Sequence, residues 1–315
     1  MSIVELYQSL RREAEKVIVG QEEAVRLLFI ALVCEGHVLL EGVPGLAKTT
    51  LVRTVAAALG LRFRRIQFTP DLMPSDVIGT QIFDFQHGKF HLVEGPVFTN
   101  ILLGDEINRA PAKTQAALLE AMQERQVSVE GAARPLPLPF LVLATQNPVE
   151  YEGTYPLPEA QLDRFLFKAK LEYPTLEEEV SILEQHRGDT AGLSTLIDSV
   201  SRVADAEELR RAKEQALLVR IDGSVTRYLV DLVRRTREHV YIQLGASPRA
   251  ALLLQIASRA AAALAGRDYV VPDDIKSLFV PALRHRVILT TSAEVEGLGA
   301  DQVLRDVANV VPVPR

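Results

Sequence analysis

The sequence is poor in cysteine, in positive charge and in long apolar runs, and each shortage excludes a class of protein. Cys34 is the one cysteine among the 315 residues, so an internal disulfide is excluded. We expect its thiol to act as a small buried apolar group, and a chain without disulfides fits a reducing compartment. The formal net charge of -6 argues against a surface built mainly to grip nucleic acid.

No apolar run is long enough to cross a bilayer. The stretch LLFIALVC at residues 27–34 is too short, and the first seventeen residues mix acids and bases at helical spacing, unlike a signal peptide. A content of 48% hydrophobic and 24% charged residues is ordinary for a folded protein. We therefore expect a cytoplasmic protein without a membrane span.

The segment EGVPGLAKTTL, residues 41–51, has the layout of a phosphate-binding loop. Gly42, Ala47, Lys48 and Thr49 occupy its four fixed places, and only Ala47 departs, because glycine is usual there. An apolar run, HVLLEG, precedes the loop, and a helical stretch that ends near Gly60 follows it. Strand, loop and helix are the context that a phosphate site requires.

The residue types in this loop suit a nucleotide. Backbone N–H groups of residues 42–49 would surround the β- and γ-phosphates at the positive end of the helix, and a side chain larger than methyl at Ala47 would crowd them. Lys48 would add positive charge, and the Thr49 hydroxyl would bind Mg²⁺. The alternative is a Gly-Pro turn leading into an ordinary helix.

A second segment, ILLGDEIN, supplies the acids that such a loop needs. Asp105 and Glu106 end an apolar strand, where Asp105 would hold the Mg²⁺ shell and Glu106 would take a proton from the attacking water. The alternative is an acidic pair on the surface. The segment ILLGDEIN follows the loop in the order and at the separation that a nucleotide site requires, which favours the nucleotide interpretation.

Three further polar residues are candidates for catalysis. Asn147 follows the next apolar strand and could bond the γ-phosphate or the water, or simply form an Asn-Pro turn. Arg249 lies in the first turn of a predicted helix, where a cation is unfavourable unless an anion compensates it. Arg164 precedes the fifth strand and could stabilise a transferring phosphoryl group. For both arginines the alternative is a salt bridge, which for Arg164 would be to Asp163 or Glu159.

The pattern of apolar runs predicts an α/β domain followed by a helical one. Five short runs begin at residues 38, 63, 101, 141 and 165 and fit a parallel sheet. Residues 79–98 and 126–137 read as two inserted hairpins. After about Tyr173 only helices are expected, so we predict a sheet domain over residues 1–173 and a helical domain over 174–315.

Taken together, GVPGLAKT, LLGDEIN, ATQNP, LPEAQLDRF and GASPRA resemble AAA+ ATPases, most closely the MoxR family, over essentially the whole chain. The family's own loop commonly has alanine where Ala47 stands. The resemblance implies a P-loop fold with a parallel five-stranded sheet, a helix-2 insert hairpin, a pre-sensor-1 hairpin and a C-terminal all-helical lid.

The resemblance also implies roles for the candidate residues. Asp105 and Glu106 correspond to Walker B, Asn147 to sensor 1, Arg249 to sensor 2 and Arg164 to an arginine finger acting on a neighbour. The implied nucleotide-binding residues are Val19 and Gly20 in the adenine-contacting segment 17–20, and Gly42, Pro44, Gly45, Leu46, Ala47, Lys48, Thr49 and Thr50 in Walker A. Thr49 and Asp105 are the implied metal ligands.

The implied activity is ATP hydrolysis with Mg²⁺ in a homo-oligomeric ring, expected to be a hexamer. The family works as a chaperone-like remodeller that matures or metallates protein clients, often with a von Willebrand A-domain partner. The alternatives are an ATPase motor subunit of the magnesium-chelatase type or of the MCM-helicase type. A GTP-binding switch would need an Asn-Lys-x-Asp motif, and no asparagine here precedes a lysine.

Overall fold

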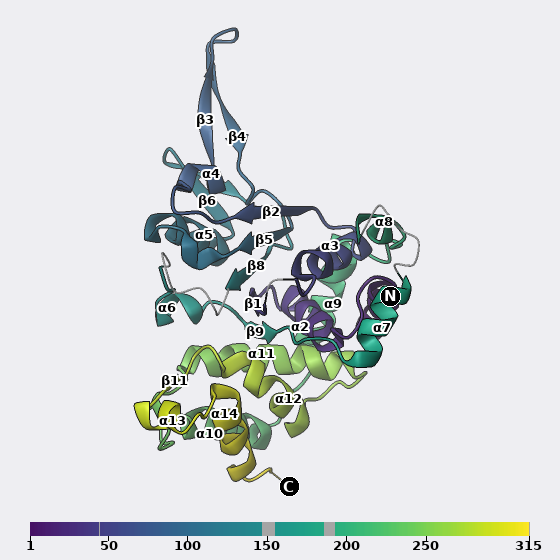
Figure 1. Cartoon of the computed structure of the whole chain (residues 1–315), viewed down its shortest axis with the longest axis vertical. Coiled ribbons are helices and arrows are strands. Elements are labelled where there is room, and N and C mark those ends of the chain that lie inside the picture. Colours follow the sequence, from purple (N-terminus) through teal and green to yellow (C-terminus); the bar gives the residue numbers. More distant parts are fainter. Residues whose placement is uncertain (44, 147–154, 186–192, 315) are drawn as a thin grey trace.

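The computed structural model describes residues 1–43, 45–146, 155–185 and 193–314. A parallel sheet lies at the centre of the molecule, a long hairpin projects from one end, and a group of helices forms the other end (Figure 1). Pro44 and Asn147, both predicted to be functional, lie outside the described residues.

The sheet has five parallel strands in the order β2-β5-β8-β1-β9, which confirms the fold class predicted from the five apolar runs. The central strand β8 pairs with β5 on one side and with β1 on the other. Parallel strands end at the same edge, so the residues that follow β1 and β5 come together. The strands are β1 Val38–Glu41, β2 Phe63–Gln67, β5 Ile101–Asp105, β8 Leu141–Gln146 and β9 Phe167–Lys170.

Both faces of the sheet are covered, which explains why its strands read as continuous apolar runs. Val38 and Leu40 face one core, shared with helices of the N-terminal and C-terminal parts, while Leu39 faces a second core beneath α5. On the first face lie α1 Ile3–Ala14, α2 Glu22–Val33, α3 Lys48–Ala58 and α9 Ala206–Leu218; on the second lie α4 Pro74–Ile78 and α5 Ala112–Glu124.

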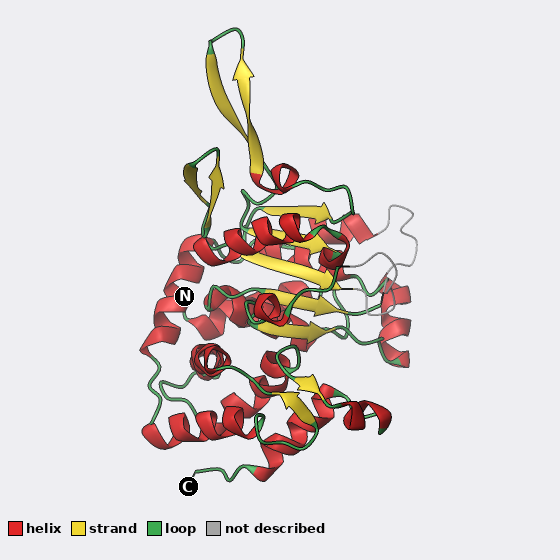
Figure 2. Cartoon of the chain, turned by 90° about the vertical axis from the view of Figure 1, so that its left-hand side faces the viewer, coloured by secondary structure: helices red, strands yellow, loops and turns green. Residues whose placement is uncertain are grey.

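Two hairpins project from the sheet domain, as predicted for residues 79–98 and 126–137. The longer one pairs β3, Gly79–Asp84, with β4, Lys89–Glu94, and stands clear of the rest of the molecule (Figure 2). The shorter one pairs β6, Gln126–Val129, with β7, Ala132–Pro135. Gly79 and Gly95 cross at the base of the long hairpin, where a Cβ on either would lie 2.3 Å from a backbone oxygen.

The C-terminal part is helical, as predicted. Helix α10, Gly223–Arg235, buries one apolar face, and α11, Pro248–Leu264, is capped by the Ser247 side chain. The remaining helices are η1 Ile107–Arg109, α6 Glu159–Leu162, α7 Leu176–Gln185, α8 Leu193–Asp198, α12 Pro272–Leu283, α13 Thr291–Val295 and α14 Ala300–Val310.

A small feature of this helical part was not foreseen. Strands β10, Ile242–Leu244, and β11, Ile288–Leu289, form a two-stranded ribbon. Segments of three and two residues are too short to display an alternating pattern.

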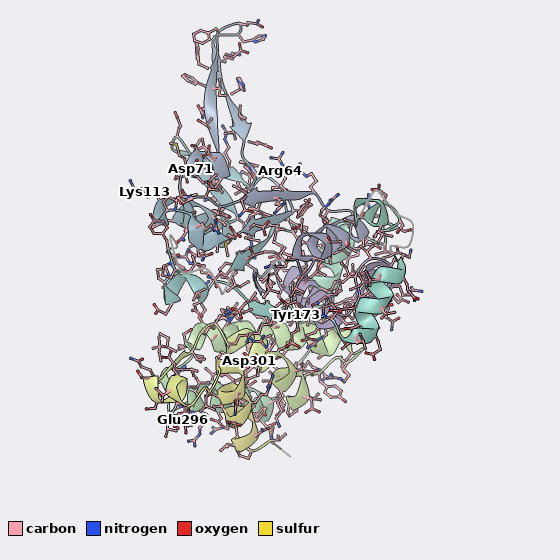
Figure 3. All side chains as sticks on the ribbon, viewed as in Figure 1. Arg64, Asp71, Lys113, Tyr173, Glu296 and Asp301 are labelled. Carbon is pink, nitrogen blue, oxygen red and sulfur yellow. The ribbon has the colours of Figure 1, made fainter. Side chains whose placement is uncertain are left out.

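The helical part packs under the sheet domain. Figure 3 places Asp301 and Glu296 among the lid helices and Arg64 on the sheet side. The predicted boundary near Tyr173 stays a prediction. In the described ranges, no helix combines the length and the apolar character needed to cross a membrane.

Candidate functional site

The predicted phosphate loop and the predicted acids meet in one cavity of about 370 Å³ at the carboxyl edge of the sheet. The chain reaches this edge four times, through the loop after β1 and through the ends of β2, β5 and β8. The lining residues are Gly45, Ala47, Lys48, Thr49, Thr50, Arg65, Gln67, Asp105, Glu106 and Thr145.

The loop owes its shape to two residues with positive φ. Gly45 has φ +90° and Ala47 has φ 50°, ψ 28°, which is the left-handed region. That region costs an L-residue about 1–2 kcal/mol, and glycine avoids most of the cost. Glycine's usual presence at position 47 therefore has a backbone cause, besides the crowding of phosphates, and Ala47 accepts the strain with the smallest side chain.

Lys48 begins α3, so its side chain lies where the N–H groups of the helix N-terminus are free to bind an anion. Its Nζ donates a hydrogen bond to the Gly42 carbonyl at 2.6 Å. Burial lowers the pKa of the ammonium, while the carboxylates of Asp105 and Glu106 act in the opposite direction. A phosphate in the cavity would give this charge a stronger partner than a carbonyl.

Thr145 holds the two acids in place. Its hydroxyl lies 3.3 Å from Asp105 Oδ1, to which it donates, and accepts the backbone N–H of Glu106 at 2.9 Å. Glu106 itself has φ 57°, which turns it away from the strand direction of Asp105. The hydroxyl therefore fixes two adjacent carboxylates in different orientations.

Strand β2 restrains both acids from the neighbouring position in the sheet. Arg65 Nε lies 2.5 Å from Asp105 Oδ2, and Gln67 Nε2 donates to Glu106 Oε2 at 2.8 Å. Arg109 Nε is 2.9 Å from the same Glu106 oxygen. Sequence reasoning missed Arg65 and Gln67 as site residues, although their alternation in FRRIQF places them on one face of the strand.

The donor set of this cavity fits Mg²⁺. Thr49 and Asp105 line the same space, and hydroxyl and carboxylate oxygens are the ligands this cation prefers. A cation at Asp105 Oδ2 would have to replace the guanidinium of Arg65.

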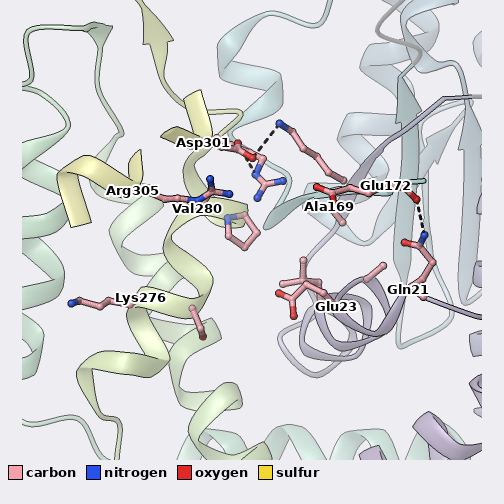
Figure 4. Close-up of a pocket in the computed structure, with 15 residues that line it drawn as sticks. Gln21, Glu23, Ala169, Glu172, Lys276, Val280, Asp301 and Arg305 are labelled. Atoms are coloured by element: carbon pink, nitrogen blue, oxygen red, sulfur yellow. Dashed lines mark hydrogen bonds and ion pairs between the residues drawn. The ribbon is translucent and has the colours of Figure 1, made fainter. Parts of the chain in front are cut away.

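The predicted adenine segment lies elsewhere. Gly20 lines a second cavity, of about 490 Å³, between α2 and the lid helices α12 and α14 (Figure 4). Across this cavity Lys170 Nζ and Arg284 Nε each lie 3.2 Å from a carboxylate oxygen of Asp301. Val19 is half-buried, as is Leu46 of the loop.

Arg164 and Arg249 lie together, at the opposite end of β1 from Lys48. Both line a third cavity, of about 440 Å³, with Gly36 and His37 at the amino end of the strand. Burial and the neighbouring charge of Arg249 lower the pKa of Arg164. Neither arginine has an acidic partner among the described residues, although Glu35 and Glu124 line the same cavity, and the carboxylate of Asp163 pairs with Arg286.

The salt bridges weighed as alternatives for the two arginines are therefore absent from the described part of the chain. Two cations in one cavity repel each other, so an anion that entered would be bound by both. Their distance from the Lys48 cavity along β1 means that such an anion is not a phosphate held by the chain's own loop.

Comparison with known proteins agrees with this architecture. A family model described as "ATPase family associated with various cellular activities (AAA)" matches residues 37–167, and one described as "AAA lid domain" matches residues 234–307. Chaperone MoxR1 of Mycobacterium tuberculosis is 44% identical, covering 96% of this chain and 81% of its own length. Protein MoxR of Methylorubrum extorquens is 34% identical, covering 96% and 94%.

A solved structure agrees as well. A crystal structure from Cytophaga hutchinsonii, described as that of a candidate ATPase, superposes with a TM-score of 0.90 at 42% identity, covering 99% of this chain and 96% of that one. The overall fold is thus shared over nearly the whole length of both chains.

Proposed function

Because the chain belongs to the MoxR family of AAA+ ATPases and is an ATP-hydrolysing enzyme, we propose that it uses Mg-ATP in an oligomeric ring to remodel a protein client. The observation that carries the proposal is the meeting of Lys48 and Thr49 with Asp105 and Glu106 in one cavity. Relatives of the MoxR type at 44% and 34% identity favour this function over a chelatase or helicase motor.

The loop would hold the nucleotide by its phosphates. Lys48 would exchange the Gly42 carbonyl for the β- and γ-phosphates, and the backbone N–H groups at the start of α3 would donate to the same oxygens. Thr49 and Asp105 would hold Mg²⁺, which when bound neutralises phosphate charge. Arg65 pairs with Asp105 Oδ2, so a cation bound at that oxygen would replace this ion pair.

Glu106 is the proposed general base. Its carboxylate would accept a proton from water as the water oxygen attacks the γ-phosphorus and the bond to the β-phosphate oxygen breaks, which yields ADP and phosphate. Gln67 and Arg109 both contact Glu106 Oε2, so the base is restrained until these contacts are released. Asn147 is the proposed partner of the γ-phosphate or the water.

Arg164 and Arg249 are proposed to act on the site of a neighbouring subunit. Both lack an acidic partner within the described ranges and lie away from the chain's own phosphate loop. A ring, proposed to be a hexamer, would bring a neighbour's γ-phosphate to them. An arginine supplied in this way stabilises charge in the transition state.

The long hairpin is the proposed contact to the client. Phe83 packs edge-on against Phe85 and Phe90 with ring centroids 5.1 and 5.0 Å apart, yet Phe85 is 90% exposed. Exposed aromatic clusters are characteristic of binding surfaces.

A von Willebrand A-domain protein is the proposed partner, and the cytoplasm is the proposed location.

Two substitutions test the assignment of the site. We expect Lys48→Ala to abolish ATP binding, because the phosphates lose their main counter-charge. Glu106→Gln should bind ATP normally and fail to hydrolyse it, because the amide cannot take the proton. Isothermal titration and a phosphate-release assay measure the two effects.

Matched controls are available on α5. Lys113→Ala and Glu120→Gln change exposed residues of the same types and should leave binding and turnover unchanged. Wild-type affinity in Lys48→Ala would refute the loop assignment, and normal turnover in Glu106→Gln would show that another group activates water.

A further inference from the structure

The segment that carries Arg164 is tied to the lid through the carboxylate of the preceding residue. Asp163 Oδ1 accepts a hydrogen bond from Arg286 Nε at 2.7 Å, and Asp163 Oδ2 accepts one from the Ser247 hydroxyl at 3.2 Å. Ser247 caps α11, in which Arg249 is the second residue, and its oxygen also accepts the Ala250 N–H. The Asp163 carboxylate thus connects the segment that carries Arg164 to the helix that carries Arg249.

Arg286 is the centre of this arrangement. Its side chain is 2% exposed, and it makes five hydrogen bonds, which equals the donor capacity of a guanidinium. Besides Asp163 Oδ1, it donates to the backbone oxygens of Asp163 at 3.0 Å, Phe165 at 2.5 Å, Leu166 at 3.2 Å and Ala282. Three of these oxygens belong to the segment 163–166.

The neighbouring His285 adds a contact to the same segment. Its Nε2 lies 3.0 Å from the Phe165 oxygen. Residues 285 and 286 follow α12, so two consecutive lid residues bind the chain just before β9. A buried charge held by several fixed acceptors leaves little freedom to the backbone around it.

Holding Arg164 and Arg249 in one cavity is electrostatically unfavourable. Arg164 and Arg249 share a cavity without an acidic partner among the described residues, and burial and Arg249 both disfavour the charged form of Arg164. The carboxylate of Asp163, next to Arg164 in the chain, is engaged by Arg286 and Ser247, and Glu35, which lines the cavity, pairs with Arg125 and Lys213. The network therefore keeps two like charges together and leaves both free for an external anion.

We propose that Arg286 and Asp163, together with Ser247, are positioning residues that present Arg164 and Arg249 as one rigid unit to the phosphate of a neighbouring subunit. The inference rests on the proposed action of Arg164 across the subunit interface. Lid and core would then deliver the two arginines together, so that a displacement of the lid would remove both from the neighbour's site at once.

Asp163→Asn is the primary test, because the amide keeps the shape and one acceptor while the charge is lost. The chain's own phosphate cavity is untouched, so a fluorescent ATP analogue should bind with wild-type affinity. The turnover number should fall by on the order of 10²-fold, the scale expected for a small misplacement of a catalytic group, with little change in KM. Arg286→Lys, with three donors in place of five, should show a milder loss of the same kind.

Mixed rings separate positioning from general destabilisation. Asp163→Asn subunits should regain activity when mixed with Glu106→Gln subunits, whose arginines are intact, but not when mixed with Arg164→Ala subunits, which lack Arg164. Ser247→Ala should follow the same pattern. Thr290→Ala removes an equivalent hydroxyl cap from α13 and should leave turnover unchanged.

The outcomes distinguish this inference from its premise. If Arg164→Ala and Glu106→Gln subunits do not complement each other, action across the interface is refuted, and the inference with it. If they complement each other but Asp163→Asn is rescued equally by Arg164→Ala, or if its KM rises while its turnover number is unchanged, the positioning role alone is refuted.

Discussion

At the scale of single residues, a buried histidine connects the stability of the fold to pH. His37 Nδ1 accepts the Val142 N–H at 3.0 Å, and Nε2 lies 3.0 Å from the Met122 oxygen. These contacts require the neutral ring with its proton on Nε2. Burial lowers the pKa of His37 to about 4.

We expect the free energy of unfolding to fall as the pH drops from about 6.5 towards 4. In this window the unfolded chain binds a proton at residue 37 that the folded chain does not, so protonation favours unfolding. The full effect corresponds to roughly 3 kcal/mol for a shift of this size. Urea unfolding at pH 7.5, 6.5 and 5.5 measures it.

Substitutions identify the source of the slope. His37→Gln should reduce the pH dependence, and so should His285→Gln, because burial likewise lowers the pKa of His285. His91→Gln, on the exposed hairpin, is the control. A wild-type slope in His37→Gln would contradict this account.

Some residues of the site can be predicted from the sequence, and others cannot. Lys48, Thr49, Asp105 and Glu106 were predicted because each local pattern carries its own chemistry, and the structure brings them into one cavity. The restraint of the acids by β2 could not be predicted in the same way. It depends on β2 pairing with β5, and the order of strands in a sheet is not written in any one segment.

At the scale of elements, the long hairpin is an attachment and not part of the core. Phe83 and Phe90 lie on one face of the hairpin and Ile82 and Val93 on the other, and all four side chains are substantially exposed. The sequence predicted the hairpin correctly but could not reveal that no described segment covers its outer part. The apolar cores end at its base, where Val77 and Val97 are buried.

We expect the outer hairpin to be dispensable for folding. If residues 82–91 are replaced by two glycines, Tm should change by no more than about 2 °C and ATP affinity should be unchanged, because exposed side chains contribute little to stability. Differential scanning fluorimetry and ATP titration check both. Phe68→Ala removes a fully buried ring beside Gly104 and should cost about 3–5 kcal/mol.

An unfolded or non-binding truncated chain would show that the hairpin is structural. Retained folding and binding would leave it free for a client. The same variant would then bind ATP yet fail to respond to a client that changes the ATPase rate of the full chain.

At the scale of the whole molecule, the chain carries the two parts of a reaction centre at opposite ends of β1. Lys48 and Glu106 lie at the carboxyl edge, while Arg164 and Arg249 lie together with His37 at the amino end. Sequence reasoning proposed roles for all four but could not place the arginines relative to the loop. That separation comes from the path of the chain before β9 and from the packing of α11, both of which are tertiary.

Such a separation has a consequence for how activity depends on assembly. If Arg164 completes a neighbour's site, a lone subunit hydrolyses ATP poorly, and activity rises more steeply than protein concentration as rings form. Arg164→Ala should still bind ATP but lose turnover by about 10³-fold, the low end for arginine fingers. Light scattering must first establish that assembly is unchanged.

Mixing provides the decisive measurement. Glu106→Gln subunits have arginines but no base, and Arg164→Ala subunits have a base but lack Arg164, so in a mixed ring an active site forms wherever the two abut in the right order. At equal proportions, activity should exceed that of either variant alone and should vary with the mixing ratio. Assembled rings that recover no activity at any ratio would rule out Arg164 as the group that acts across the interface. Since Arg109 is engaged with the chain's own Glu106, the exposed Arg134 on the shorter hairpin would then be the next residue to test.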